Sequence, residues 1–123
     1  MIAEPNVLVV DDEEVVCESC SRILTREGYK VMTTTDSRAG LQMAESGDYD
    51  AIILDVRMPE LDGMAIVDRL GRRPLTVPVI IITGYGSVPS AVEALKKGVA
   101  DYLEKPFTPE TLTRSVSQVV RVR

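Results

Sequence analysis

Three carboxylates, one hydroxyl and one lysine stand directly after apolar runs that lie far apart in this 123-residue chain. Two charges brought within 4 Å of each other repel by about 4 kcal/mol at an effective dielectric of ~20, so clustered carboxylates need a cation between them. Oxygen ligands suit Mg²⁺ or Mn²⁺, and a lysine and a hydroxyl beside such a cation suit a phosphoryl group. Aspartate is also an established nucleophile in aspartyl-phosphate chemistry. The residues are Asp11, Asp12, Asp55, Thr83 and Lys105.

Each of these residues, taken alone, has a purely structural alternative. An aspartate after a strand can cap the next helix, which applies to Asp11, Asp12 and Asp55. Thr83 can stabilise a turn, and Lys105 can be a solvated surface charge. Their joint placement at the ends of apolar runs is what favours a single site.

Apolar periodicity predicts strands that alternate with helices five times. The predicted strands are 6–10, 30–34, 51–55, 77–82 and 99–104, and the predicted helices are 16–27, 37–47, 64–70, 88–97 and 109–120. This alternation requires right-handed crossovers and a parallel sheet with helices on both faces, which is a doubly wound α/β sandwich. The carboxyl ends of parallel strands lie along one edge, so the five polar residues are expected to meet there.

Residues that commonly begin or end helices support these boundaries. Asp36 or Ser37 and Thr108 are expected to cap helices at their N-termini. Gly28 and Gly98 are expected to end two others. The strand 99–104 mixes polar with apolar residues and is expected at an edge of the sheet.

Length and charge restrict the class of protein. We interpret residues 1–123 as one domain, with the tail from about 121 as a natural end or the start of a linker. The net charge of −5 is unfavourable for binding nucleic acid directly. The sequence shows no signal peptide and no apolar run long enough to cross a membrane, so we expect a cytoplasmic protein.

Cys17 and Cys20 form a C-x-x-C pair several residues into a predicted helix. Redox pairs of this spacing lie at a helix N-terminus, and a zinc site needs further Cys or His ligands. The chain has no histidine. We therefore expect structural cysteines, one buried on the core face and one nearer the surface.

From Asn6 to Val120 the chain resembles the receiver domain of bacterial two-component response regulators. Separated motifs carry this resemblance, and they occur in order at suitable intervals. They are Val9-Val10-Asp11-Asp12-Glu13, Leu54-Asp55-Val56-Arg57-Met58-Pro59 with Asp62-Gly63, Ile82-Thr83-Gly84-Tyr85-Gly86, and Gly98-Val99-Ala100-Asp101-Tyr102-Leu103-Glu104-Lys105-Pro106-Phe107. The resemblance implies a flavodoxin-like (βα)5 fold with strand order 2-1-3-4-5.

The resemblance also implies roles for individual residues. Asp55 is similar to the phosphoacceptor that takes a phosphoryl group from a sensor histidine kinase. With Asp12 it resembles the direct Mg²⁺ ligands, assisted by Asp11 through water and by the backbone carbonyl of Arg57. Thr83 resembles the switch hydroxyl and Lys105 its charged partner, with the Lys105-Pro106 peptide bond cis. Tyr102 resembles the aromatic residue that couples to Thr83.

The output of such a domain is expected on the surface of helix 88–97, strand 99–104 and helix 109–120. Phosphorylation would change this surface, which would then pair with a partner or a second copy, and the similarity to receivers of transcription factors implies control of transcription. The residues expected on this surface are Val92, Leu95, Tyr102 and Val116. Arg57 and Tyr85 are not fixed in the family, and we expect them to prolong the phosphorylated state by hindering water.

Three other functions fit the sequence less well. A phosphatase of the haloacid-dehalogenase type needs a second acid two residues after its nucleophile, where this chain has Arg57. A flavodoxin-like cofactor module needs a Ser-, Thr- and Gly-rich loop after the first strand, where this chain has four acids, residues 11–14. A degenerate receiver that only scaffolds would not need the full set of polar residues. We expect a switch rather than a turnover enzyme.

Overall fold

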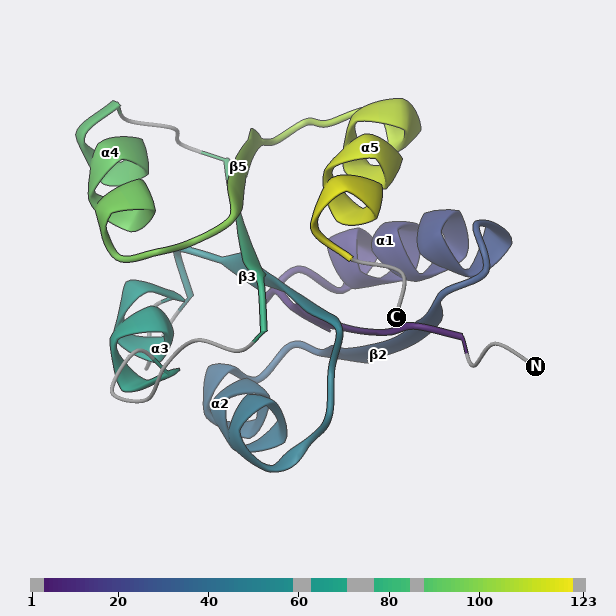
Figure 1. The fold of residues 1–123 in the computed structure, drawn as a ribbon, viewed down its shortest axis with the longest axis horizontal. Coiled ribbons are helices and arrows are strands. Elements are labelled where there is room, and N and C mark those ends of the chain that lie inside the picture. Colours follow the sequence, from purple (N-terminus) through teal and green to yellow (C-terminus); the bar gives the residue numbers. More distant parts are fainter. Residues whose placement is uncertain (1–3, 59–62, 71–76, 85–87, 121–123) are drawn as a thin grey trace.

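Continuous apolar runs form the central strands of the fold, as their lack of polar alternation predicts. The computed structural model describes residues 4–58, 63–70, 77–84 and 88–120. Its strands are β1 (Asn6–Val10), β2 (Lys30–Thr34), β3 (Ala51–Asp55), β4 (Val79–Thr83) and β5 (Asp101–Glu104). Its helices are α1 (Glu14–Arg26), α2 (Ser37–Ser46), α3 (Gly63–Leu70), α4 (Val88–Lys96) and α5 (Pro109–Val119) (Figure 1).

The strands form one parallel sheet in the order β2-β1-β3-β4-β5, which confirms the predicted topology. Val10 is paired with Leu54, and Asp55 with Ile82. The carboxyl ends of β1, β3 and β4 therefore lie side by side. The mixed strand β5 is at an edge, as predicted.

Alternate residues of each strand point to opposite faces of the sheet and enter two separate hydrophobic cores. On one face, Val9, Ile53 and Ile82 pack with residues of α1 and α5. On the other face, Leu54 and Ile81 pack with residues of α2, α3 and α4. Figure 1 shows these two groups of helices on opposite sides of the sheet.

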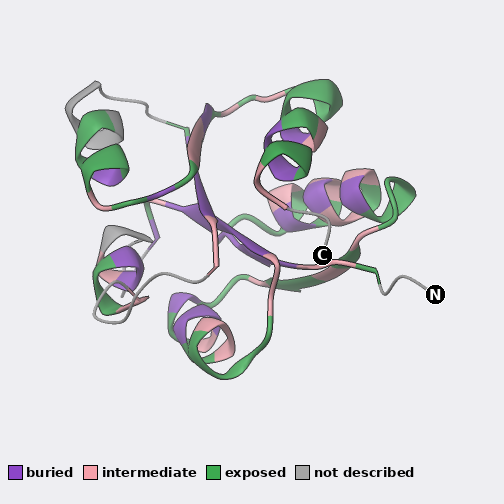
Figure 2. Ribbon diagram, viewed as in Figure 1, coloured by how far each residue is buried: buried purple, intermediate pink, exposed green. Residues whose placement is uncertain are grey.

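The central strands are buried completely, whereas the helices expose their outer surfaces (Figure 2). Val116 of α5 was predicted on the reporting surface, but this prediction is wrong because its side chain is fully buried. It lies one helical turn after Leu112, so both side chains point into the same core. Val92 and Leu95 of α4 are exposed, as that surface requires.

Most predicted boundaries are confirmed to within two residues. Asp36 caps α2 by accepting hydrogen bonds from the backbone N–H groups of the first turn, and Thr108 caps α5 in the same way. β4 begins at Val79, two residues later than predicted, because Pro78 has no N–H to donate to a neighbouring strand. Gly28 follows α1 with a φ of 93°, a conformation that favours glycine.

No helix among the described residues is long and apolar enough to span a membrane.

Candidate functional site

The ends of three central strands place polar residues in the interior of the protein. Asp11 follows β1, Asp55 ends β3 and Thr83 ends β4, with side chains that are 0%, 3% and 2% exposed. Buried carboxylates are rare unless they have a charged partner or a metal ion. The burial of the two carboxylates therefore calls for cationic partners.

Lys105, directly after β5, supplies one such partner. Its ammonium nitrogen lies 2.8 Å from Asp11 Oδ2, 2.8 Å from Glu13 Oε1 and 3.3 Å from Asp55 Oδ2. The Lys105 side chain is only 13% exposed, so these interactions are poorly screened by water. The structure thus brings together Asp11, Asp55 and Lys105, as the strand ends predict.

Backbone hydrogen bonds fix the orientation of these side chains. The N–H of Glu13 donates to Asp11 Oδ1 over 2.8 Å, and the N–H of Arg57 donates to Asp55 Oδ1 over 3.1 Å. The N–H of Lys105 donates to the carbonyl of Thr83 over 2.7 Å. Each acid therefore keeps its other oxygen, Oδ2, directed at Lys105.

Four acids offer oxygen atoms that lie within 4.8 Å of one another, and together they could hold a metal ion. Asp11 Oδ2 is buried and, despite the ammonium 2.8 Å away, accepts no well-aligned hydrogen bond among the described residues. This oxygen can still accept a hydrogen bond from a metal-bound water, and the exposed Asp12 beside it can bind an ion directly. The pair therefore suits a hard cation that retains some of its water. The acids are Asp11, Asp12, Glu13 and Asp55.

Glu13 was not among the predicted site residues. It follows Asp11 and Asp12 directly, so a run of four acids was visible in the sequence. Only the first two were assigned to the site, because acids in the first turn of a helix are common for their interaction with the helix dipole. The structure shows that the Glu13 carboxylate instead contacts Lys105.

Burial and mutual repulsion shift the titration of these groups. Burial, and then the charge of Asp11, raise the pKa of Asp55 to about 6. Burial also raises the pKa of Asp11, against the opposing effect of its contact with Lys105. Burial alone would lower the pKa of Lys105, but its contacts with Asp11 and Glu13 and the charge of Asp55 raise it above its ordinary value. The site therefore favours cations, and it holds its lysine charged.

Thr83 ends β4, which lies between β3 and β5, and its carbonyl accepts a hydrogen bond from the N–H of Lys105. Strand alternation groups Thr83 with Val79 and Ile81, whose side chains pack in the core beneath α3 and α4. Tyr102 of β5 packs against the same core. Tyr102, predicted to take part in the switch, therefore lies on the face covered by α4, whose outer surface carries Val92 and Leu95.

Several predicted features lie at or beyond the limit of the described residues. Pro59, Asp62, Tyr85 and the tail from 121 fall outside them. Arg57 is described, with an exposed side chain and a backbone N–H that binds Asp55. The Lys105-Pro106 peptide bond is cis, as the resemblance implies.

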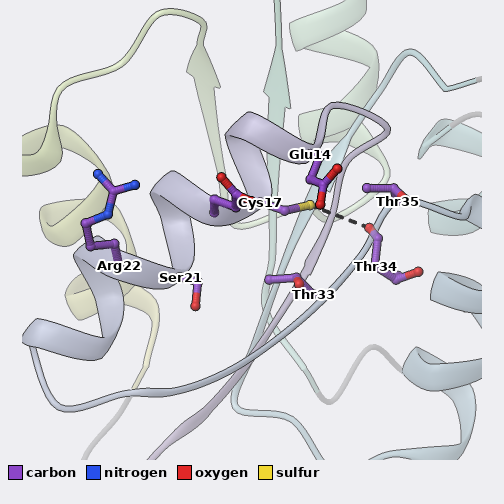
Figure 3. A pocket seen from close by; sticks show the side chains of 8 residues that line it. Glu14, Cys17, Ser21, Arg22, Thr33, Thr34 and Thr35 are labelled. Carbon is purple, nitrogen blue, oxygen red and sulfur yellow. Dashed lines mark hydrogen bonds between the residues drawn. The ribbon is translucent and has the colours of Figure 1, made fainter.

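The prediction that one cysteine lies nearer the surface is wrong, because Cys17 and Cys20 are both buried. Residues three apart share one face of a helix, and here that face lies on the core. The Cys17 thiol points from α1 towards β2 and donates to the carbonyl of Thr34 over 3.7 Å (Figure 3). Burial raises the pKa of Cys17 to about 11 and that of Cys20 to about 12, so neither thiol is a nucleophile at neutral pH.

A groove of about 770 Å³ opens beside Lys105, between α1 and the segment that follows β5. Val15 of α1, 64% exposed, lies on its wall. Val16, Ile23, Pro106 and Phe107 add further apolar lining. An apolar groove next to a charged site offers a surface on which a partner could rest.

A family model described as the response regulator receiver domain matches residues 7–117. The chain belongs to this family. Receiver domains are signalling domains of response regulators, which favours a switch over the phosphatase and the flavodoxin-like module considered above. The fold and the arrangement of strand ends agree with this assignment.

Similar proteins include transcriptional regulators. The chain is 38% identical to the C4-dicarboxylate transport transcriptional regulatory protein DctD of Pseudomonas aeruginosa, over 98% of its own length and 26% of that protein. It is 35% identical to the transcriptional regulatory protein FixJ of Bradyrhizobium diazoefficiens, over 98% of its own length and 59% of that protein. The chain thus spans only part of these relatives.

A solved structure of an activated receiver is also similar. The solution structure of the beryllofluoride-activated NtrC4 receiver domain dimer is 40% identical, with a TM-score of 0.87, over 94% of this chain and 95% of that one. That receiver is a dimer in its beryllofluoride-activated form.

Proposed function

We propose that this receiver is a phosphoryl-accepting switch in which Asp55 takes a phosphoryl group from the phosphohistidine of a sensor kinase. The observation that carries the proposal is the contact of Lys105 with two buried carboxylates, Asp11 and Asp55. These contacts hold the lysine beside Asp55, where its ammonium can bind the oxygens of a phosphoryl group attached to that residue.

The transfer forms one bond and breaks another. A carboxylate oxygen of Asp55 forms a P–O bond to phosphorus while the P–N bond of the phosphohistidine breaks and its electron pair returns to the imidazole. The reaction ends when water attacks phosphorus, the bond to Asp55 breaks, and the carboxylate and inorganic phosphate are released with a proton. Lys105 binds the phosphoryl oxygens during both steps and offsets their charge.

Mg²⁺ or Mn²⁺ would supply charge neutralisation between Asp55 and the incoming phosphoryl group. Asp12 and Asp55 would bind the ion directly, and Asp11 would do so through water. The backbone carbonyl of Arg57 would complete the protein's share. The exposure of Asp12 and the spare capacity of Asp11 Oδ2 support this assignment.

The phosphorylated state would be reported on the α4–β5–α5 side of the molecule. The Thr83 hydroxyl would donate a hydrogen bond to the phosphoryl group. The Tyr102 side chain would change its conformation together with Thr83. Tyr102 packs in the core beneath α4, whose Val92 and Leu95 are 42% and 53% exposed. We propose that this surface pairs with a second copy and controls transcription. The beryllofluoride-activated NtrC4 receiver is a dimer, and the relatives DctD and FixJ are transcriptional regulators, which supports the proposal.

The kinase would approach through the groove beside Lys105. The phosphohistidine must reach Asp55, and the groove opens next to the lysine that contacts Asp55. Its apolar wall, with the exposed Val15, suits an apolar helix of the kinase.

Incubation with acetyl phosphate and Mg²⁺, followed by intact mass measurement, tests the proposal. We expect one added phosphoryl group in the parent and in Asp48→Asn, which removes an exposed carboxylate away from the site. We expect none in Asp55→Asn. Equal addition in Asp55→Asn, or no addition to the parent, would refute the proposal.

A further inference from the structure

Glu13 occupies the N-cap position of α1 but does not cap it. The backbone carbonyl of Glu13 accepts hydrogen bonds from the N–H groups of Val16 and Cys17, as an N-cap carbonyl does. Its side chain makes no capping hydrogen bond. Short polar side chains stabilise this position by about 1 kcal/mol, so a glutamate here forgoes a common source of helix stability.

The Glu13 side chain reaches Lys105 instead. Its Oε1 accepts a hydrogen bond from the Lys105 ammonium over 2.8 Å, which is shorter than the 3.3 Å between that ammonium and Asp55 Oδ2. The backbone N–H of Glu13 simultaneously holds Asp11 Oδ1. Glu13 therefore forms hydrogen bonds with both members of the Asp11–Lys105 ion pair.

An ammonium has three protons, and three carboxylates surround this one. The Lys105 ammonium donates hydrogen bonds to Glu13 and Asp55 and forms an ion pair with Asp11. A phosphoryl group on Asp55 would draw the ammonium towards its new oxygens, and one of the other contacts would have to lengthen. Asp11 is fully buried, so loss of its contact with the lysine would be costly. The Glu13 side chain is 56% exposed, so water can replace the lysine there at the lowest cost.

We propose that Glu13 is a positioning residue that holds the Lys105 ammonium in the resting site and yields it to the phosphoryl group. This inference rests on the proposed function and deepens it. Glu13 competes with the phosphoryl oxygens for the Lys105 ammonium. It therefore sets how readily the active state forms, although it touches no reacting atom.

The test compares the beryllofluoride affinity of the parent with that of Glu13→Gln and Glu14→Gln. Glu14→Gln removes the same formal charge one residue away, from a side chain that lines the groove between α1 and β2 rather than the one beside Lys105. The measurement uses ¹H–¹⁵N NMR at saturating Mg²⁺ and about 0.15 M salt, where the Debye length is about 8 Å. Thermal unfolding of each apoprotein records any structural effect separately.

Loss of a half-exposed ion pair predicts that Glu13→Gln binds beryllofluoride about two- to fivefold more tightly than the parent. Glu14→Gln should bind as the parent does. A weaker or unchanged affinity in Glu13→Gln, or an equal gain in Glu14→Gln, would overturn the inference while leaving the proposed function intact. Failure of the parent itself to bind beryllofluoride would instead refute the proposed function, and this inference with it.

Discussion

The ammonium of Lys105 lies 3.3 Å from Oδ2 of Asp55, although 50 positions separate the two residues in the sequence. Strand β4 lies between their strands in the sheet. The side chains meet because alternation along β3 and β5 directs Asp55 and Lys105 to the same face, the face covered by α1 and α5. A parallel sheet thus joins distant residues at one edge without any local motif.

Replacement of Asp55 by asparagine should stabilise the protein at neutral pH in the absence of divalent cations. Because the folded-state pKa of about 6 exceeds the ordinary value of 3.8, ionisation of Asp55 opposes folding. The contribution of Asp55 to the free energy of unfolding is therefore greatest below pH 3.8 and declines as the pH rises through 6. We expect Asp55→Asn to be about 1–3 kcal/mol more stable than the parent at pH 8, with the difference vanishing near pH 4.

Urea unfolding in the presence of a chelator at both pH values measures this difference. Asp48→Asn, which removes an exposed carboxylate, should show little change at either pH. A difference between Asp55→Asn and the parent that persists undiminished at pH 4 would contradict the assigned cause.

Magnesium should stabilise the parent but not an Asp12→Asn variant. A ligand that binds only the folded state adds about 1.4 kcal/mol for each tenfold excess over its dissociation constant. Asp12 is exposed and belongs to the acidic cluster, so its replacement should leave the apoprotein within about 0.5 kcal/mol of the parent. Thermal unfolding with increasing MgCl₂ gives the comparison, with Glu18→Gln on the outer surface of α1 as control. An equal gain in Asp12→Asn and the parent would exclude Asp12 as a ligand.

Replacement of Arg57 by asparagine should shorten the lifetime of the phosphorylated state. The Arg57 side chain is exposed two residues after Asp55, where its bulk would hinder an attacking water molecule. We expect a half-life at least about threefold shorter, which corresponds to a barrier lower by about 0.7 kcal/mol. Intact mass measured over time after removal of acetyl phosphate gives the rate, and Arg114→Asn on α5 is the control. A parent half-life no longer than that of Arg57→Asn would rule out this role.

Loss of the Thr83 hydroxyl should leave phosphorylation of Asp55 intact but prevent the dimerisation that follows it. Valine has nearly the same shape as threonine and fits a site that is 2% exposed, but it cannot donate a hydrogen bond. We expect Thr83→Val to accept a phosphoryl group on Asp55 without forming the dimer that the parent forms. Light scattering with and without beryllofluoride measures the dimer, and Thr83→Ser should retain it. Dimerisation of Thr83→Val to the extent of the parent would argue against a switch at this position.

The fold could be predicted from the sequence because several independent sequence patterns indicate the same arrangement of strands and helices. Apolar runs, capping residues such as Asp36 and Thr108, and alternation of strands with helices all favour the same sheet. The convergence of Asp11, Asp55 and Lys105 followed from strand ends alone. What these patterns could not determine was the direction and reach of individual side chains.

Glu13, Cys17 and Val116 illustrate that limit. A glutamate at a helix start is compatible with both solvent and a lysine 92 positions away, and only the tertiary structure decides between them. The Cys17 thiol packs in the core with the Asp11 carbonyl 3.3 Å away, a contact that helix periodicity alone does not predict. Val116 lies on the inner stripe of α5, and the same stripe cannot also face a partner.

Replacement of Gly40 by alanine should destabilise the protein by pressing on the strand that leads to Asp11. A Cβ atom at Gly40, in α2, would lie 2.6 and 2.8 Å from the two methyl carbons of Val10, the residue that precedes Asp11. Alanine normally stabilises a helix interior by about 0.5–1 kcal/mol relative to glycine, so a loss would identify the clash as the cause. Overpacking of this kind costs about 1–3 kcal/mol.

Urea unfolding of Gly40→Ala, Val10→Ala and the double variant separates the clash from other effects. Val10→Ala removes the two methyl groups that the new Cβ would meet, at the cost of a small cavity. If the clash is responsible, Gly40→Ala should cost much less stability in the Val10→Ala background than in the parent, since residues in contact do not act additively. Additive effects of the two substitutions would show that α2 does not press on β1 at this point.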